Sequence, residues 1–136
     1  MKSLFCVAMF AGVAATVLAQ TDASSLSGTW VLQKDNTVKL VLEQTSDSVH
    51  VKETKGDRVV ADYTCKTDGK DCKVKEEGHS EKVSLWFNGP KLVELITRGS
   101  DVTRRRFTVA DGGKTLQVEL APMSTPEKTE VLAYSR

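Results

Sequence analysis

Short runs of alternating hydrophobic and polar residues cover the chain from residue 27 to its end. Because successive side chains of a strand point to opposite faces of a sheet, this period of two predicts strands that bury one face. Residues that favour turns separate the runs, as in Gly56-Asp57, Gly99-Ser100 and Asp111-Gly112-Gly113. The predicted strands cover residues 27–33, 37–45, 48–55, 58–66, 71–77, 81–87, 91–98, 101–109, 114–121 and 128–135.

The turns are short enough to join each strand to the next as an antiparallel pair. A meander of this length leaves two exposed edges unless it closes on itself. We therefore predict an all-β fold over residues 27–136, an antiparallel up-and-down meander of about eight to ten strands that closes into a small barrel. A flat or sandwiched sheet is the alternative.

Tight turns fix which residues of neighbouring strands lie opposite each other. Turns at Asn88-Gly89, Gly99-Ser100 and Gly112-Gly113 pair Leu85 with Leu92, Trp86 with Lys91, Glu94 with Arg105 and Phe107 with Val118. All three turns place the apolar side chains on one face, formed by Val83, Leu85, Phe87, Leu92, Ile96, Phe107, Val109, Leu116, Val118 and Leu120. We expect this face to be the interior, and Trp86 to lie outside, in a cation–π contact with Lys91 or in a partner site.

The same register places one carboxylate and one guanidinium on the inward face. A charge that faces an apolar interior costs free energy unless it is paired, and an Arg fork suits a carboxylate. Glu94 and Arg105 then either form a structural ion pair that fixes the register, or face the lumen, where Arg105 would hold the polar head of a ligand. The candidate ligand-binding residues are Glu94, Arg105, Phe107 and Tyr63.

The first 19 residues differ from the rest of the chain. Lys2 precedes an almost wholly apolar stretch, and small residues stand near a cleavage site before Gln20. We predict a signal peptide over residues 1–19, a polar lead-in over residues 20–26, and a secreted or periplasmic product without a membrane anchor after cleavage.

Cys65 and Cys72 flank the sequence KTDGKD. A two-residue turn at Asp68-Gly69 would set them opposite each other, and export supplies an oxidising compartment, so we predict a disulfide. A zinc site is the alternative, but the two cysteines and the scattered histidines lack zinc-ligand spacing, and we expect no metal.

Charge and motifs exclude several functions. Without Lys2 the 19 basic residues fall to 18 and equal the 18 acidic ones, so no nucleic-acid partner is expected. No nucleophile elbow, phosphate loop or dinucleotide fingerprint occurs, and His50 and His79 are expected in solvent. Glu76 and Glu77 are interpreted as a solvated acidic turn, because adjacent strand residues point to opposite faces. We predict no catalytic residue, no cofactor and no enzymatic activity.

Gly28-Thr29-Trp30 opens the first predicted strand and resembles the Gly-x-Trp signature of the calycin superfamily, which includes lipocalins and fatty-acid-binding proteins. The resemblance implies that Trp30 closes one end of the barrel, with Gly28 beneath it and Arg136, Arg105 or Arg98 against it. It also implies a small hydrophobic ligand. Two features depart from fatty-acid-binding proteins: residues 34–37 leave no room for their helical lid, and Leu132-Ala133-Tyr134 replaces their Arg-x-Tyr clamp.

The segment SSLSGTWVL also resembles the start of small periplasmic inhibitors of bacterial metalloproteases, whose N-terminal trunk enters the protease. Residues 23–25 would be that trunk. The sequence therefore predicts a secreted or periplasmic, non-enzymatic, lipocalin-like barrel that binds a small apolar or amphipathic ligand. The alternative is a protein-binding barrel such as a periplasmic protease inhibitor.

Overall fold

The computed structural model describes residues 25–76 and 78–136, and in this part of the chain ten antiparallel strands form one sheet. The predicted signal peptide and residues 20–24 of the lead-in lie outside the described residues. The strands are β1 (Gly28–Leu32), β2 (Val38–Gln44), β3 (Ser48–Lys55), β4 (Arg58–Lys66), β5 (Cys72–Glu76), β6 (His79–Asn88), β7 (Lys91–Arg98), β8 (Asp101–Ala110), β9 (Thr115–Pro122) and β10 (Glu130–Ser135). Two short 3₁₀ turns, η1 (Asp111–Gly113) and η2 (Pro126–Lys128), flank β9. The predicted all-β meander is confirmed.

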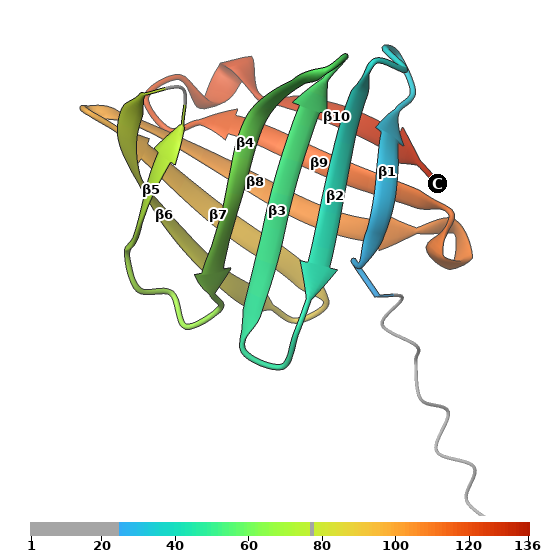
Figure 1. Cartoon of the computed structure of the whole chain (residues 1–136), viewed down its shortest axis with the longest axis horizontal. Helices are drawn as coiled ribbons and strands as arrows, with labels where there is room; N and C mark the ends of the chain where they lie inside the picture. Colours follow the sequence, from blue (N-terminus) through green and yellow to red (C-terminus); the bar gives the residue numbers. More distant parts are fainter. Residues whose placement is uncertain (1–24, 77) are drawn as a thin grey trace, which may run out of the picture.

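The sheet curls into a nearly closed barrel. Its strand order is β4-β3-β2-β1-β10-β9-β8-β7-β6-β5, so the first strand pairs with the last. In Figure 1, β1–β4 lie in front and the strands from β7 to β10 cross behind them at a steep angle. The consecutive strands β4 and β5 are the two ends of this order, and no backbone ladder of the described residues joins them. We call this junction the seam.

The Cys65–Cys72 disulfide spans the seam. The predicted bridge is present, with Cα atoms 5.9 Å apart, but the predicted hairpin around Asp68-Gly69 is wrong. The Gly69 N–H donates to the Leu85 carbonyl at 2.8 Å and Asp68 forms an isolated bridge with Trp86, so the loop turns toward β6 instead of pairing β4 with β5. The covalent bond thus joins two strands that lack a shared ladder.

Two of the three predicted registers are confirmed, with Glu94 opposite Arg105 and Phe107 opposite Val118. The third is wrong, because the β6–β7 turn lies at Gly89-Pro90 and closes with the pair Asn88–Lys91. A turn at Asn88-Gly89 would need a backbone N–H from Pro90 at its closing pair, and proline has none. Trp86 therefore lies opposite Val93 and not Lys91, while the inward face stays the same because the shift is two residues.

Trp30 lies at the end of the barrel that holds the start of β1 and the end of β10, which we call the closed end. Its side chain is fully buried, and its indole Nε1 donates to the Leu26 carbonyl at 2.8 Å. Of the three candidate arginines, Arg136 lies against it, with the guanidinium carbon 4.3 Å from the ring centre. Arg136 also donates to the carbonyls of Ser27 at 2.9 Å and Gly113 at 2.6 Å. It thus connects the residue before β1 and the residue after β10 to the β8–β9 turn.

Gly28 is required at this closed end for two reasons. Its φ of +148° is rarely adopted by residues with a Cβ, and a Cβ built there would stand 3.0 Å from Arg136 Nη1. Apolar side chains fill the closed half of the barrel, chiefly Trp30, Leu40, Leu42, Val49, Val51, Leu85, Leu92, Phe107, Leu116, Val118 and Tyr134.

Replacing Trp30 with alanine should lower the free energy of unfolding by about 3–5 kcal/mol, because a large buried aromatic leaves a cavity. Urea denaturation of the two proteins measures this loss. Trp86→Ala is the matched control, since Trp86 is only half-buried on the outer face and its removal should cost less. Equal losses in the two variants would contradict the role of Trp30 as the closing residue.

Replacing Cys65 and Cys72 together with serine should lower the free energy of unfolding by about 2–3 kcal/mol, the loop-entropy value for so short a loop. Peptide mapping without reductant should find the two cysteines linked in the native protein. Reductant should destabilise the native protein by the same amount and leave the double variant unchanged. Two free thiols in the native protein would contradict the bridge.

Candidate functional site

A cavity of about 560 Å³ lies at the end of the barrel opposite Trp30. Its walls come from the ends of β3, β5 and β7, the starts of β4, β6 and β8, and one residue of β9. Both strands that border the seam therefore contribute to it. The lining residues are Glu53, Arg58, Val60, Ala61, Glu76, Glu81, Ile96, Arg98, Asp101, Thr103, Arg105 and Leu120.

A buried polar network forms the floor of this cavity. Arg105 Nε donates to Glu94 Oε2 at 2.8 Å, and Tyr63 donates its hydroxyl hydrogen to Glu94 Oε1. The two terminal nitrogens of Arg105 donate to Glu53 Oε2 and to the Tyr63 hydroxyl oxygen, each at 3.3 Å. The guanidinium also lies 5.2 Å from the centre of the Phe107 ring. The four predicted ligand-binding residues are thus brought together, with Glu53 as a fifth member.

The network holds a permanent cation at the bottom of the cavity. Burial alone would lower the pKa of Arg105, but the Glu94 carboxylate, its hydrogen bond and Glu53 outweigh burial and raise the pKa above its usual value. Burial also raises the pKa of Tyr134 to about 12, and the Glu53 carboxylate adds to this effect. Tyr134 therefore remains neutral at physiological pH.

A second charged cluster lies at the open end. Glu81 Oε1 accepts hydrogen bonds from Arg98 Nε at 2.5 Å and from Arg98 Nη2, and Glu76 Oε2 lies 3.8 Å from the same Nη2. The Glu81 side chain is only 1% exposed, and its Oε2 has no hydrogen-bond partner among the described residues. Burial and the adjacent Glu81 carboxylate raise the pKa of Glu76 to about 7.

This cluster corrects the interpretation of Glu76 as part of a solvated acidic turn. The Glu76 side chain is 12% exposed and faces inward, whereas Glu77 lies outside the described residues. The alternation that placed Val83 and Leu85 on the inner face also applies to Glu81, two residues before Val83. The same alternation along β5 and β6 predicts that the Glu76 and Glu81 side chains both face inward.

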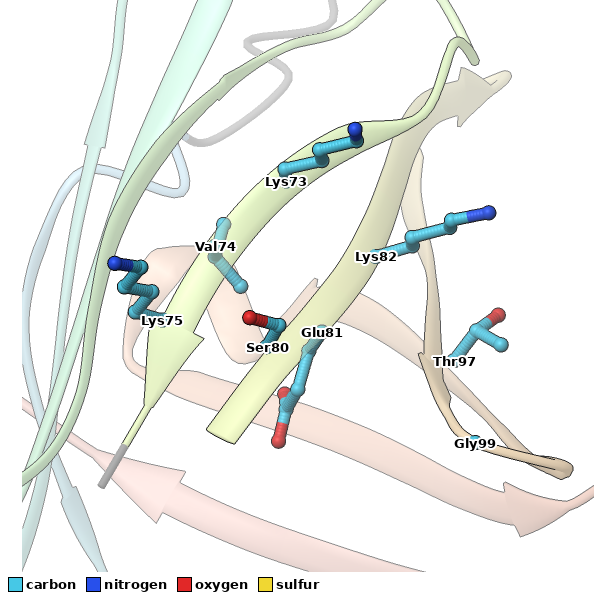
Figure 2. A pocket seen from close by; sticks show the side chains of 8 residues that line it. All are labelled: Lys73, Val74, Lys75, Ser80, Glu81, Lys82, Thr97 and Gly99. Atoms are coloured by element: carbon cyan, nitrogen blue, oxygen red, sulfur yellow. The ribbon is translucent and has the colours of Figure 1, made fainter. Parts of the chain in front are cut away.

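A separate hollow of about 520 Å³ lies beside β5, β6 and β7. Three lysines surround it, and Lys73 lies directly opposite Lys82 in the ladder. Figure 2 shows the Glu81 carboxylate pointing away from Lys82, although Glu81 borders this hollow as well as the cavity. The acidic cluster therefore faces the inside of the barrel and the lysines face outward.

No protein-family model matches the sequence, and none of the curated proteins matches it at a significant level. Solved structures do match the fold. A protein described as the REP1-NXSQ fatty acid transporter aligns with a TM-score of 0.67 and 15% identity, over 82% of this chain and 95% of that chain. Fatty-acid-binding protein 1 of Echinococcus granulosus aligns with a TM-score of 0.66 and 16% identity, over 82% and 96%.

A secretory abundant heat soluble protein of Ramazzottius varieornatus aligns with a TM-score of 0.62 and 14% identity, over 77% of this chain and 75% of that chain. The chain shares the fold of these proteins. Identities this low concern the fold alone, and the function has to be argued from the site.

In this barrel the four predicted site residues have different positions. Arg105 lines the cavity, while Glu94, Tyr63 and Phe107 lie beneath it, almost wholly buried. Residues 33–37 join β1 to β2 as turns, without a helical lid over the open end. The cavity is therefore bordered by the charged ends of the strands themselves.

The predicted bystander histidines lie outside the cavity. His50 Nε2 lies 2.6 Å from Asp62 and Nδ1 lies 3.4 Å from Glu43, and the hydrogen bond with Asp62 raises the pKa of His50. His79 is exposed at the start of β6. In residues 25–76 and 78–136, no cluster of His, Cys, Asp and Glu could hold a metal ion. No helix in the described part of the chain has the length and hydrophobicity that crossing a membrane requires.

Replacing Arg105 with leucine should lower the free energy of unfolding by about 3–5 kcal/mol, because Glu94 would remain as a buried charge without its cation. Glu94→Gln should cost less, since Arg105 keeps Glu53 as a partner. The double variant should lose less than the sum of the two single losses, as measured by urea denaturation.

The matched control is the Arg106–Glu119 pair on the outer face. Arg106 Nη1 lies 3.6 Å from Glu119 Oε1, and each of the two side chains is about one-third exposed. Exposed pairs contribute at most about 1 kcal/mol, so the losses from Arg106→Leu and Glu119→Gln should be small and additive. Additive losses at Glu94 and Arg105 would contradict the buried pairing.

Proposed function

We propose that this protein is an exported, non-enzymatic barrel that binds a small amphipathic molecule in the cavity at its open end. The observation that carries the proposal is the cavity itself. Its volume of about 560 Å³ falls within the usual range of small-molecule sites, about 300–1,000 Å³. A permanent cation and its fixed partners stand at its floor.

The lining of the cavity supports an amphipathic ligand rather than a wholly apolar one. Val60, Ala61, Ile96 and Leu120 provide apolar surface, and seven charged residues share the same walls. Because side chains fill the closed half of the barrel, the ligand is limited to the open half. The fatty acid transporter and the fatty-acid-binding protein with the same fold support a ligand-binding role in general terms.

Export is part of the proposal. The apolar leader with its basic start is the sequence signal, and the Cys65–Cys72 disulfide at the seam suits an oxidising compartment such as the periplasm or the cell exterior. The protein-binding alternative rests on residues 23–25, of which the structure describes only Ser25. No observation in the described residues favours it over ligand binding.

Native mass spectrometry of protein purified from its own host tests the proposal. We expect a retained small molecule in the native protein. Ile96→Trp, which places an indole in the cavity, should lose it, and Val131→Trp should keep it, because Val131 lies on the outer surface and is 62% exposed.

Nile red, a neutral fluorescent probe, gives a second measurement with the same variants. It should bind the native protein and Val131→Trp, and bind Ile96→Trp at least about tenfold more weakly, which is about 1.4 kcal/mol. Equal binding to all three proteins, or no binding of any small molecule, would contradict the proposed function.

A further inference from the structure

Carboxyl groups outnumber guanidinium groups around the cavity. Among the described lining residues, four carry carboxyl groups and three carry guanidinium groups: Glu53, Glu76, Glu81 and Asp101 against Arg58, Arg98 and Arg105. Glu94 adds a further buried carboxyl group at the floor. Arg105 is already shared by Glu94 and Glu53, and Arg98 by Glu81 and Glu76. An anionic ligand would therefore meet cations that are already neutralised and carboxylates that repel it.

Glu81 is a buried carboxylate in the wall of the cavity. The residue is 97% buried, its exposed fraction being 3%, and it lines the cavity with one oxygen bonded to Arg98 and the other, Oε2, without a partner in the described part of the chain. A buried acceptor without a donor costs free energy. A ligand that brings a hydrogen-bond donor to this oxygen would remove that cost.

Glu76, at the end of β5, lies near the same Arg98 nitrogen as the Glu81 carboxyl group. Burial and the charge of Glu81 favour its protonated form near neutral pH, and in that form it can donate its proton to Glu81. Without a ligand, this proton stabilises the carboxyl pair. A ligand that brings its own donors and positive charge can replace it.

We propose that the Glu76–Glu81 pair binds the ammonium group of a cationic amphipathic ligand whose apolar part lies against Ile96 and Leu120. An ammonium group offers three N–H donors and no acceptor, so it can bond Glu81 Oε2 and Glu76 together. Charge-assisted hydrogen bonds of this kind are about twice as strong as neutral ones. This inference rests on the proposed function, because it requires that the cavity bind a small molecule.

Binding of the ammonium group requires Glu76 to release its proton. The groups that face Glu76 across the cavity are Glu81 on β6, Arg98 on β7, Arg105 and Asp101 on β8, Glu53 on β3 and Arg58 on β4. An alkylammonium stays charged up to about pH 10, as a lysine does, so Glu76 is the group that titrates near neutrality. As the pH increases toward 7, the affinity for the ammonium ligand should increase by up to about tenfold per pH unit. Above about pH 8 the affinity should level off, as one linked proton requires.

Calorimetry and Nile red displacement with octylamine, octanoate and octanol test the inference on the full mature protein. These probes share a chain length and differ in headgroup charge. At pH 8, octylamine should bind at least about tenfold more tightly than octanoate, and the affinity for octanol should lie between the two. At pH 6, the binding of octylamine should release a proton to the buffer. Equal affinities for octylamine and octanoate would overturn the inference.

Glu76→Gln separates a binding role from a structural one. Glutamine resembles the protonated carboxyl group and keeps a donor for Glu81, so this variant removes the titrating charge without removing the hydrogen bond. It should lose the preference for octylamine and the pH dependence of binding. Glu119→Gln, on the outer face beside Arg106, should keep both.

The outcomes distinguish the two proposals. Binding of octanol without a preference for octylamine would overturn the cation site and leave the proposed function intact. No binding of any of the three probes, together with no retained molecule in native mass spectrometry, would overturn the proposed function itself. An unchanged preference for octylamine in Glu76→Gln would overturn the role of the carboxyl pair.

Discussion

Arg105 connects the two halves of the sheet through the interior of the barrel. From β8 it contacts Glu94 on the neighbouring β7, and it reaches across the lumen to Glu53 on β3 and Tyr63 on β4. Since β4 and β5 share no ladder among the described residues, the two halves are joined at the seam by side chains such as the Cys65–Cys72 disulfide. A buried ion pair adds little net stability, but separating its two charges costs much free energy. The network therefore favours the arrangement in which β3 and β4 lie across the lumen from β7 and β8.

The two ends of the barrel are closed by different physical means. At one end, Trp30 and Arg136 bury an aromatic surface and donate to the backbone carbonyls of Leu26, Ser27 and Gly113. At the other end, charged side chains stand at the strand ends around an open cavity. The Arg105 network lies between the packed half and the open half. The depth of the cavity is therefore determined by a polar floor rather than by the length of the barrel.

The fold is shared with barrels of low sequence identity, so the ligand preference has to follow from the side chains that line this cavity. Carboxyl groups outnumber guanidinium groups in its lining, and the buried Glu81 has an oxygen without a donor among the described residues, an arrangement that disfavours an anionic headgroup. The lysines lie on the outer side of β5 and β6, where the period of two places them. The alternation of side chains along β5 and β6 thus places the carboxylates on the inner face of the sheet and the lysines on its outer face.

The sequence by itself determined the strands, their faces and the Glu94–Arg105 pair, because each of these depends on neighbours in the chain or on one tight turn. It also contained the reason for the shifted β6–β7 register, since Pro90 lacks the N–H that the expected turn needs. Only the tertiary structure decided which arginine lies on Trp30, which strands border the seam and which residues join Arg105 from β3 and β4. Those contacts join residues far apart in the chain, and their partners depend on how the sheet closes, which no local pattern specifies.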